Sequence, residues 1–484
     1  MEWRIFMIDV AVIGAGVVGG MIARELTRYK ISVCIAEKEC DVAMGATSAN
    51  SAIVHAGFDA KPGSLKAKLN VRGSEMMEDV ARKLGVKYKR NGSLVVGFGD
   101  EDEATLKGLL ERGVENGVRE LKLLTRDEVR EIEPNIGEGV TCALHAPTGA
   151  IICPYELAMA AIGSAMDNGA ELMLNFEVVA ITAIDGGYEI SSRDGRSIRV
   201  KYVINCAGVY SDSVAAMVGD DSFTVSPRRG EYMLLDRECG SLIRSTVFRC
   251  PSKMGKGVLV SPTVDGNLLL GPTAEDIEDK EDKTTTAEGL LKVRTLAAEQ
   301  VSGINPGKVI TSFTGLRATG SSGDFIINSP ACGIINCAGI ESPGLSASPA
   351  IAEYVADMLR ECGLELSARE DFIEERRAIH FFSELDVAGK NAVIAEHPEY
   401  AHIICRCEGI SEGEILNAIR TNPKPTTVDG VKRRTRATMG RCQGGFCSPY
   451  IIELLASELG VDYTDVTKCG GGSYIATGKT KEVG

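Results

Sequence analysis

No uninterrupted apolar run in this chain of 484 residues approaches the ~20 residues that a membrane-spanning helix needs, so we predict no membrane span. Basic side chains are in the minority, 53 against 67 acidic ones. The resulting net charge of −14 excludes a general nucleic-acid-binding protein, which needs a basic face. Residues 1–7 lack the layout of a secretory signal peptide, which predicts a cytoplasmic protein. A peripheral contact with the inner face of a membrane is left open.

The bulk composition is that of an ordinary globular protein. Hydrophobic residues make up 44% and charged residues 25%, which argues against a disordered chain or a collagen-like fibre. At about 100–200 residues a domain, the length predicts roughly two to four domains.

Cysteine is plentiful, with 15 residues. Without a secretion signal, reduced thiols in the cytosol are the expected state. Many cysteines stand singly in apolar runs, as Cys34, Cys206 and Cys337 do, and such residues often act as small buried hydrophobes. Four others form two close pairs near the C-terminus, a spacing typical of metal ligands.

Residues 8–37 have the pattern of a strand, a glycine-rich turn, a helix and a second strand. Gly14, Gly16 and Gly19 form a G-x-G-x-x-G motif between the first strand and the helix. The first glycine permits a tight turn, the second lets the backbone approach a pyrophosphate, and the third allows close helix–strand packing. Glu37 ends the second strand, where its carboxylate can accept from ribose hydroxyls. The pattern predicts a dinucleotide site, with a purely structural glycine turn as the alternative.

Three further segments carry a resemblance to a known family. They are residues 44–51 followed by His55-Ala56-Gly57, residues 203–211, and residues 337–344. In this order they resemble the D-amino-acid-oxidase (DAO) superfamily of FAD-dependent oxidoreductases, which implies FAD rather than NAD. The resemblance implies these FAD-contacting residues: Gly14, Gly16, Gly19, Glu37, Lys38, Thr47, Ser48, Asn50, Ser51, Val178, Ala207, Gly208, Gly339, Gly344 and Leu345.

The family resemblance also implies a fold, an α/β protein with an α+β insert. A Rossmann-type FAD-binding domain (about 1–85, 146–220 and 308–365) would enclose a β-rich substrate domain (about 86–145 and 221–307). Residues 366–400 have mixed charge and little periodicity and are predicted to be a linker, and residues 401–470 to be a small helical domain.

A helix is predicted to begin near Pro349, with Ser346 or Ser348 as its N-cap. Its N-terminus, with backbone N–H groups around Gly344 and Leu345, would stabilise negative charge on reduced flavin. The alternative is an ordinary capped helix that packs on the sheet.

The substrate end resembles two related subfamilies. Residues 55–66, Arg229-Gly230-Glu231-Tyr232 and Leu316-Arg317-Ala318 resemble L-2-hydroxyglutarate dehydrogenases and oxidases. Glycerol-3-phosphate dehydrogenases share the His-x-Gly element. Both substrate types are secondary alcohols that carry an anionic group, so a small anionic hydroxy compound is the expected substrate.

Oxidation of such an alcohol needs a base and an anion-binding cation beside the flavin. His55 is the best candidate for the base, because imidazole titrates near neutral pH. Arg317 is the best candidate for the cation, because guanidinium binds carboxylate or phosphate bidentately. Lys61, Arg229 and Tyr232 are secondary candidates. A histidine that only bonds FAD or backbone, and an arginine in a structural ion pair, are the alternatives.

The paired cysteines are Cys405 and Cys407 in a C-x-C motif, and Cys442 and Cys447 in a C-x4-C motif. Four thiolates in two close pairs suit one zinc ion or a [2Fe–2S] cluster. The segment resembles the bacterioferritin-associated-ferredoxin-like domain, which implies [2Fe–2S], and the C-terminal domain of the large subunit of anaerobic glycerol-3-phosphate dehydrogenase. Nearby glycines would free backbone N–H groups for the cluster sulfurs.

Together these features predict an FAD-dependent dehydrogenase that passes electrons through a [2Fe–2S] cluster. The substrate placed first is sn-glycerol 3-phosphate, ahead of an L-2-hydroxy acid such as L-2-hydroxyglutarate and of an amine or amino acid. An electron-transfer subunit with no substrate of its own is a further alternative. A quinone, a second flavoprotein or another electron-acceptor subunit is the expected partner, in an oligomer or hetero-complex. The basic run 432–434, with Arg436, is either a docking site for an acidic partner or a solvated face.

Overall fold

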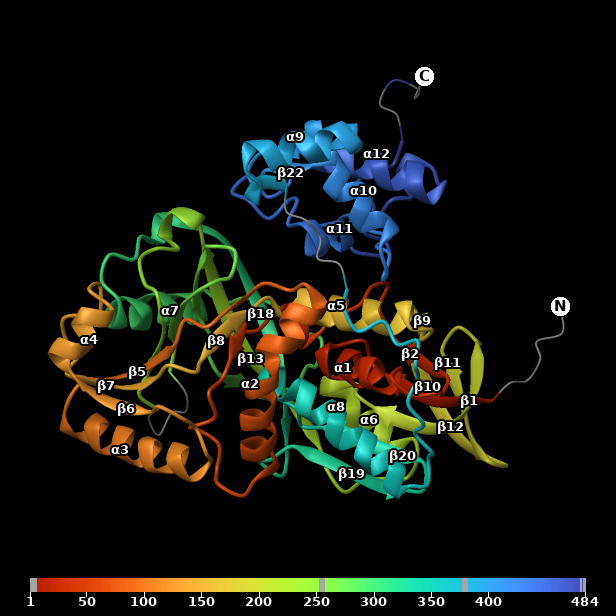
Figure 1. The fold of residues 1–484 in the computed structure, drawn as a ribbon, viewed down its shortest axis with the longest axis horizontal. Coiled ribbons are helices and arrows are strands. Elements are labelled where there is room, and N and C mark those ends of the chain that lie inside the picture. Colours follow the sequence, from red (N-terminus) through yellow and green to blue (C-terminus); the bar gives the residue numbers. More distant parts are fainter. Residues whose placement is uncertain (1–6, 252–256, 377–381, 479–480, 482–484) are drawn as a thin grey trace.

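The computed structural model describes residues 7–251, 257–376, 382–478 and 481. Apart from Met7, the residues used in the signal-peptide prediction lie outside these ranges. The described residues form two packed α/β parts, with a small helical domain resting on them (Figure 1). No helix among them is long and apolar enough to cross a membrane.

The first part is built on a mostly parallel sheet. Its parallel strands lie in the order β9 (Glu171–Met173), β2 (Val33–Ala36), β1 (Ile8–Ile13), β12 (Ser197–Asn205) and β20 (Ile334–Ala338). The antiparallel strands β10 (Val178–Ile184), β11 (Gly187–Ser192) and β19 (Ile326–Ala331) extend it. Residues 10–13 of β1 are buried, as expected for an apolar strand covered on both faces. This arrangement confirms the predicted Rossmann-type domain.

Helices α1 (Val17–Leu26), α5 (Pro154–Asp167), α8 (Gly344–Glu361) and α2 (Leu65–Leu84) pack together in the first part, with α1 against both α5 and α8. Helix α6 (Ser211–Ala216) packs near β12 and β20. Gly73 on α2 allows close contact with α8, because a Cβ atom there would lie 2.2 Å from the Ser346 carbonyl oxygen.

Helix α8 begins earlier than predicted, at Gly344 with Pro343 as its N-cap, so neither Ser346 nor Ser348 is an N-cap. Pro349 lies inside the helix and has no N–H for the Leu345 carbonyl. The Ser348 hydroxyl donates to that carbonyl at 2.9 Å instead. A proline is therefore accommodated where the sequence predicted a helix start.

The second part contains a nine-stranded sheet. Its strands, in spatial order, are β17 (Glu275–Asp276), β13 (Val225–Leu235), β16 (Leu268–Gly271), β15 (Leu259–Pro262), β14 (Thr246–Arg249), β5 (Ser93–Gly97), β7 (Cys142–Ala146) and β6 (Lys122–Thr125), with β18 (Val309–Gly320) also on β13. Helices α3 (Asp100–Glu115), α4 (Arg126–Ile132) and α7 (Ala287–Gln300) complete this part. The prediction assigned residues 308–320 to the FAD-binding domain, but β18 pairs along the length of β13 in the second sheet. The other predicted domain bounds stay predictions.

A small sheet of β3 (Ile53–Val54), β8 (Ala150–Ile152) and β4 (Tyr88–Lys89) lies where the chain passes between the two parts.

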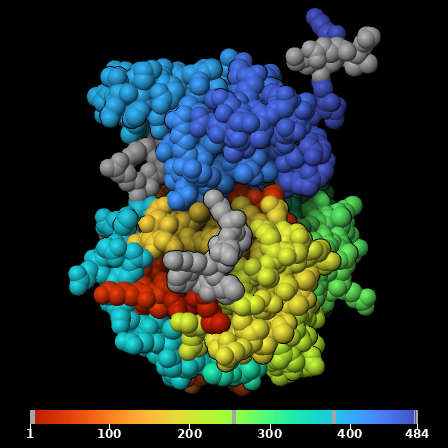
Figure 2. All heavy atoms as spheres, turned by 90° about the vertical axis from the view of Figure 1, so that its right-hand side faces the viewer, coloured from red at the N-terminus to blue at the C-terminus, as the bar shows by residue number. Residues whose placement is uncertain are grey.

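The C-terminal domain has its own core, formed by Ile415, Val431, Ile451, Leu455 and their neighbours. Its elements are β21 (Ile403–Cys405), β22 (Ile410–Ser411), α10 (Glu412–Arg420), α11 (Val428–Thr435) and α12 (Ser448–Leu459). In the space-filling view it is a distinct lobe on top of the rest (Figure 2). The predicted linker is not wholly irregular, because it contains α9 (Val387–Glu396), which is capped by Asp386.

A buried ion pair joins the C-terminal domain to the first part. Asp41 follows β2 and is 1% exposed. Arg434 of α11 binds both of its carboxylate oxygens, at 2.8 and 2.9 Å, and Arg433 adds a contact of 2.6 Å. The basic run therefore docks its own chain, so the predicted external partner and the solvated face are both wrong for these two arginines.

Arg436 makes a second ionic contact across the domains. It is 6% exposed, and its guanidinium binds Glu408 at 3.0 Å, Asp265 at 2.7 Å and Asn267 at 3.1 Å. The latter two residues belong to the second part, so the C-terminal domain contacts both other parts.

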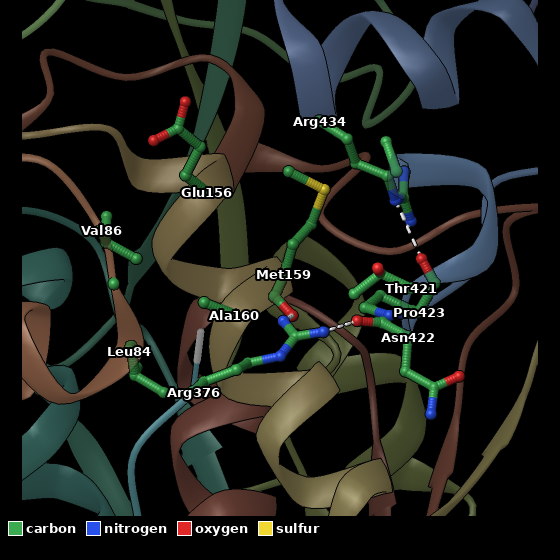
Figure 3. Close-up of a pocket in the computed structure, with 12 residues that line it drawn as sticks. Leu84, Val86, Glu156, Met159, Ala160, Arg376, Thr421, Asn422, Pro423 and Arg434 are labelled. Atoms are coloured by element: carbon green, nitrogen blue, oxygen red, sulfur yellow. Dashed lines mark hydrogen bonds between the residues drawn. The ribbon is translucent and has the colours of Figure 1, made fainter. Parts of the chain in front are cut away.

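A cavity of about 60 Å³ lies at this junction, between α5 and the turn that follows α10. In the close-up, Arg434 bonds the carbonyl of Pro423 and Arg376 bonds that of Asn422 (Figure 3). Both guanidiniums are thus used to hold this turn in place.

Replacing Asp41 by asparagine is expected to destabilise the protein by about 3–5 kcal/mol at pH 7, because the buried guanidinium of Arg434 and the half-buried one of Arg433 lose their counter-charge. Burial alone would raise the pKa of Asp41, but Arg434 and Arg433 outweigh it and hold the pKa below its ordinary value. The ion pair therefore stabilises the folded protein at pH values above the ordinary carboxyl pKa of about 3.9, and this stabilisation is lost as pH falls through the lowered value.

The free energies of unfolding of D41N and wild type, measured with urea, should differ at pH 7 and converge in acid. The matched variant Glu375→Gln breaks an exposed pair with Arg82 and should change little. A D41N deficit that persists unchanged in acid would contradict this account.

Candidate active site and metal centre

The glycine loop after β1 has the geometry that its sequence pattern predicts. Gly14 has a φ of +106°, and a Cβ atom there would lie 2.4 Å from the Cys206 carbonyl oxygen. A Cβ atom at Gly19 would lie 2.0 Å from the Gly14 carbonyl oxygen. Gly16 is the N-cap of α1 and offers no side-chain hydrogen bond to the first turn. The Val17 N–H, the first of α1, is taken by Thr47 Oγ1, and the remaining N–H groups of the first turn, with the helix dipole, can attract a phosphate group.

Glu37 lies at the carboxyl end of β2 and is 9% exposed. Its carboxylate accepts from the backbone N–H groups of Ala15, at 2.7 Å, and Glu39, at 3.0 Å. Burial raises the pKa of Glu37, and these two hydrogen bonds oppose the shift. The acid is thus held beside the glycine loop. Lys38 instead pairs with Glu281 at 3.0 Å and lies over the ring of Tyr210.

The loop of residues 44–51 is fixed against the glycine loop. Thr47 Oγ1 accepts from the Val17 N–H at 3.0 Å, and Ser48 donates to the Gly45 carbonyl. Asn50 bonds three backbone groups of its own loop. Ser51 Oγ lies 3.2 Å from the Tyr232 hydroxyl, which connects this loop to the second sheet.

The remaining predicted FAD contacts follow other strands of the first sheet. Ala207 and Gly208 come after β12, and Gly339 comes after β20. Because carboxyl ends of parallel strands meet at one edge, these residues share an edge with Gly14 and Glu37. Gly208 has a φ of +59° and open space where a Cβ atom would be. Gly344 and Leu345 form the first turn of α8, and Val178 begins β10. The set fits a dinucleotide with its pyrophosphate at α1 and a ribose at Glu37.

His55 directly follows β3 and is held to the start of α8 from two sides. Its backbone N–H donates to Ser346 Oγ at 2.7 Å, and its Nε2 lies 3.3 Å from Ser342 Oγ. The ring also lies 5.7 Å, centroid to centroid, from that of Phe248 in the second part. The histidine therefore lies between the N-terminus of α8 and the second sheet.

Arg317 and Tyr232 lie on the same face of the second sheet. In the pairing of β13 with β18, Arg317 lies opposite Arg228, and Phe313 lies opposite Tyr232. Arg228 and Tyr232 are four positions apart on β13, and side chains an even number of positions apart point to the same face of a sheet. Between them, a Cβ atom at Gly315 would lie 1.8 Å from the Ala49 carbonyl oxygen, so this face meets the 44–51 loop. Arg317 donates to the Thr273 carbonyl at 3.1 Å.

Arg229 lies on the opposite face, because side chains alternate along a strand. Its guanidinium contacts Glu275 at 2.6 Å and Asp282 at 3.0 Å. This arrangement makes Arg229 a structural ion-pair residue and contradicts its role as a secondary substrate ligand. Lys61 is exposed in the loop before α2, and among the described residues no side-chain contact places it beside His55 or Arg317.

Sequence reasoning missed the two serines that hold His55. Ser342 and Ser346 are separated from it by 287 and 291 positions, so only the folded chain brings them together. The resemblance of residues 337–344 marked the segment of Ser342 but not its contact.

The four paired cysteines combine across the two motifs. Cys407 Sγ lies 3.5 Å from Cys442 Sγ, and Cys405 is hydrogen-bonded to Cys447. The bond from Cys447 lowers the pKa of Cys405 to about 6. Cys405 and Cys447 are buried and Cys407 is exposed, so the two pairs lie at different depths.

Backbone N–H groups surround these sulfur atoms. Cys442 receives hydrogen bonds from residues 444–446, and Cys405 from Thr438 and Glu408. A Cβ atom at Gly440 would lie 2.3 Å from Cys407 Cβ, so only glycine permits this approach. Among the described residues no group of three or more His, Cys, Asp or Glu side chains is placed to hold a metal ion, so the thiols stand as two pairs, and the N–H donors around them suit the charge on an iron–sulfur cluster and its ligands. Cys469 lies outside the set, and its carbonyl accepts from Cys40 Sγ at 3.2 Å.

Comparisons with known proteins agree with both sites. Residues 9–358 match the FAD dependent oxidoreductase family, and residues 403–457 match the BFD-like [2Fe-2S] binding domain. A glycerol 3-phosphate dehydrogenase from Caloramator mitchellensis is 50% identical over 477 residues, which cover 98% of this chain and 99% of that protein. Human mitochondrial L-2-hydroxyglutarate dehydrogenase is 33% identical over 282 residues, covering 55% and 60%.

A solved structure is also similar, that of dithionite-reduced L-alpha-glycerophosphate oxidase from Mycoplasma pneumoniae with FAD bound. Its TM-score is 0.73 at 30% identity, over 77% of this chain and 98% of that chain. These matches confirm the predictions of an FAD-dependent oxidoreductase and of a [2Fe–2S] domain. The chain belongs to the family of FAD-dependent oxidoreductases and carries a BFD-like [2Fe–2S] binding domain after its catalytic part.

Proposed function

We propose that this protein oxidises sn-glycerol 3-phosphate to dihydroxyacetone phosphate and passes the electrons through its [2Fe–2S] cluster to another redox protein or a quinone. The carrying observation is the similarity to a glycerol 3-phosphate dehydrogenase, 50% identical along 98% of this chain, so that both modules are matched. The proposal extends to a hetero-complex with an electron-acceptor subunit. We place the protein in the cytoplasm, where thiolate ligands of a cluster would stay reduced.

In the proposed reaction His55 takes the proton of the substrate hydroxyl at its imidazole. FAD, when bound, would supply the acceptor for the hydride of the carbon that bears this hydroxyl, and the cluster would supply a one-electron carrier. Ser346 fixes the backbone of His55, while Ser342 orients the ring through Nε2. A base held at both ends keeps one orientation toward the bound alcohol, and such positioning accelerates proton transfer.

Arg317 is the proposed anchor for the phosphate. One of its N–H groups is used by the Thr273 carbonyl, and no ion pair with a described carboxylate occupies the rest of the fork. The face that carries it meets the 44–51 loop, the same loop that approaches the pyrophosphate end of the FAD site. Guanidinium can therefore bind two phosphate oxygens at once.

Anaerobic mixing of the FAD-loaded protein with single compounds tests the proposed substrate. Flavin absorbance should bleach with sn-glycerol 3-phosphate. Bleaching by L-2-hydroxyglutarate, glycine or L-proline instead would reassign the substrate. No bleaching by any of the four would overturn the proposal in favour of an electron carrier.

Replacing Arg317 by lysine is expected to raise KM for glycerol 3-phosphate by about 10- to 100-fold, which corresponds to about 1.5–3 kcal/mol for a hydrogen bond to a charged group. Lysine keeps the charge but not the bidentate fork. Steady-state kinetics with a dye acceptor measures the effect.

Arg228→Lys is the matched control, because Arg228 is opposite Arg317 in the strand pairing and bonds Asp276 at 2.6 Å. Its KM should remain near wild type. Equal effects of the two substitutions would refute Arg317 as the specific anchor.

A further inference from the structure

Exposed apolar side chains are concentrated in the C-terminal region. Of the thirteen large hydrophobic side chains exposed among the described residues, eight lie after residue 386. They are Val387, Ile403, Phe446, Tyr450, Leu459, Val461, Tyr474 and Ile475. Exposed apolar groups that share one small domain, as Ile403, Phe446, Tyr450 and Leu459 do, mark a surface for a partner.

The most exposed of them lies in a cluster-ligand loop. Phe446, between Cys442 and Cys447, is 79% exposed, and its backbone N–H donates to Cys442. Tyr450, one helical turn on, is 50% exposed and lies edge-on to the ring of His402 at 6.2 Å. We call Ile403, Arg406, Cys407, Phe446 and Tyr450 the cluster rim. The Phe446 ring therefore does not contribute to the core of the domain, although it lies next to a predicted cluster ligand.

The rim has one positive charge available to a partner. The ligand-bearing segments 403–407 and 437–450 contain Arg406 and Arg441 and no acidic residue, in a chain whose net charge is −14. Arg441 is used by Asp236, at 3.0 Å, and Glu238, at 2.9 Å, of the second part. Arg406 is exposed and makes no ion pair within the described residues. A cluster and its thiolates would add negative charge beneath the rim. Arg406 is therefore the positively charged side chain of the rim that can bind a carboxylate of a partner.

We propose that the cluster rim is the docking surface for a one-electron redox protein that presents its cofactor at an apolar surface edged by carboxylates. The inference rests on the proposed function, in which electrons leave through the cluster. Cys407 is the ligand at the surface, whereas Cys405 and Cys447 are buried, so the rim offers the shortest exit from the cluster. Aromatic and arginine side chains are the residues that dominate binding energy in small interfaces. A patch of five residues suits a transient electron-transfer encounter.

The soluble domain of cytochrome b5, an acidic haem protein, is the probe, and the full-length protein with FAD and cluster loaded is the enzyme. Each glycerol 3-phosphate gives up two electrons and two protons, and two haem irons pass from iron(III) to iron(II). Arg406→Glu should slow cytochrome reduction by about tenfold or more at low salt, and raising the salt should shrink this difference. Phe446→Ala should slow it at every salt concentration.

Flavin bleaching keeps the docking test separate from the chemistry. Bleaching by substrate should match wild type in both variants, because the flavin site lies on other elements, and the visible cluster spectrum of each variant records whether its cluster is retained. Arg119→Glu is the control variant with the same reversal of charge. Arg119 follows α3, and α3 lies on the opposite side of the molecule from the C-terminal domain (Figure 1). It should leave cytochrome reduction unchanged.

Wild-type rates of cytochrome reduction in both rim variants would overturn the inference. A second result would also overturn it: the wild type sediments with phosphatidylglycerol vesicles, and the rim variants do not, while their rates of cytochrome reduction are unchanged. The rim would then be a membrane contact. If wild-type flavin is not bleached by glycerol 3-phosphate, the proposed function fails. The rim is then still tested by mixing cytochrome with protein reduced by stoichiometric dithionite.

Discussion

Replacing Cys442 by serine is expected to abolish electron transfer to a protein acceptor while substrate still reduces the bound flavin at the wild-type rate. Cys442 lies 3.5 Å from Cys407, and hydrogen bonds from residues 444–446 converge on its sulfur. Serine is a poorer ligand for iron than thiolate, so the cluster should be lost or impaired. The flavin site lies on other elements, the last of which, α8, ends at Glu361, 26 positions before α9 begins at Val387, and it keeps its own contacts. Iron content, visible absorbance and stopped-flow flavin bleaching measure the two functions separately.

Cys469→Ser is the control for this experiment. Cys469 is an exposed cysteine near the same domain, but only its backbone contacts Cys40. Its replacement should leave iron content and acceptor reduction intact. An unchanged iron–sulfur spectrum in C442S, or its loss in the Cys469 variant, would contradict the assignment of ligands.

Replacing His55 by alanine is expected to lower the rate of flavin reduction by about 10²–10⁴-fold, the usual contribution of a general base, while FAD stays bound. Retention of FAD follows from the structure, because the glycine loop, Glu37 and Thr47 are held by contacts that do not include the imidazole. Single-turnover mixing with glycerol 3-phosphate measures the rate, and the flavin spectrum measures occupancy.

Chemical rescue distinguishes a base from a residue with a structural role. If His55 is the base, added imidazole should restore part of the rate of flavin reduction in H55A, because it can occupy the vacated space and accept the proton. His397→Ala is the control, because that histidine is 54% exposed and pairs with Glu396 and Glu399 on the C-terminal side of the chain. Near-wild-type turnover of H55A would remove His55 as the base.

The sequence pattern predicted those elements whose structure is set by residues close to them along the chain. The glycine loop is the best example, because Gly14 needs a positive φ and Gly19 contacts the Gly14 carbonyl only five residues away. Strand β10 is fixed in a similarly local way, since a two-residue turn joins it to β11. The four paired cysteines were likewise recognisable from their spacing as candidate metal ligands.

Predictions failed where distant partners changed the meaning of a local pattern. Pro349 indicated a helix start, but Ser348 satisfies the carbonyl that the proline leaves free, so the helix begins at Gly344. The basic run indicated a surface, yet Asp41, nearly 400 positions away, buries it.

Residue types at short spacings predicted a dinucleotide site after the first strand and a metal or cluster site near the C-terminus, because short spacings survive in any fold that satisfies them. The family resemblance implied FAD, and His55 and Arg317 stay proposals for the site of an anionic alcohol. Which side chains lie together became known only from the folded chain. Strand parity placed Arg317 on the face toward the 44–51 loop and Arg229 on the other face, and burial turned a basic run into a domain junction. Contacts of this kind depend on packing between segments hundreds of residues apart, which no local pattern encodes.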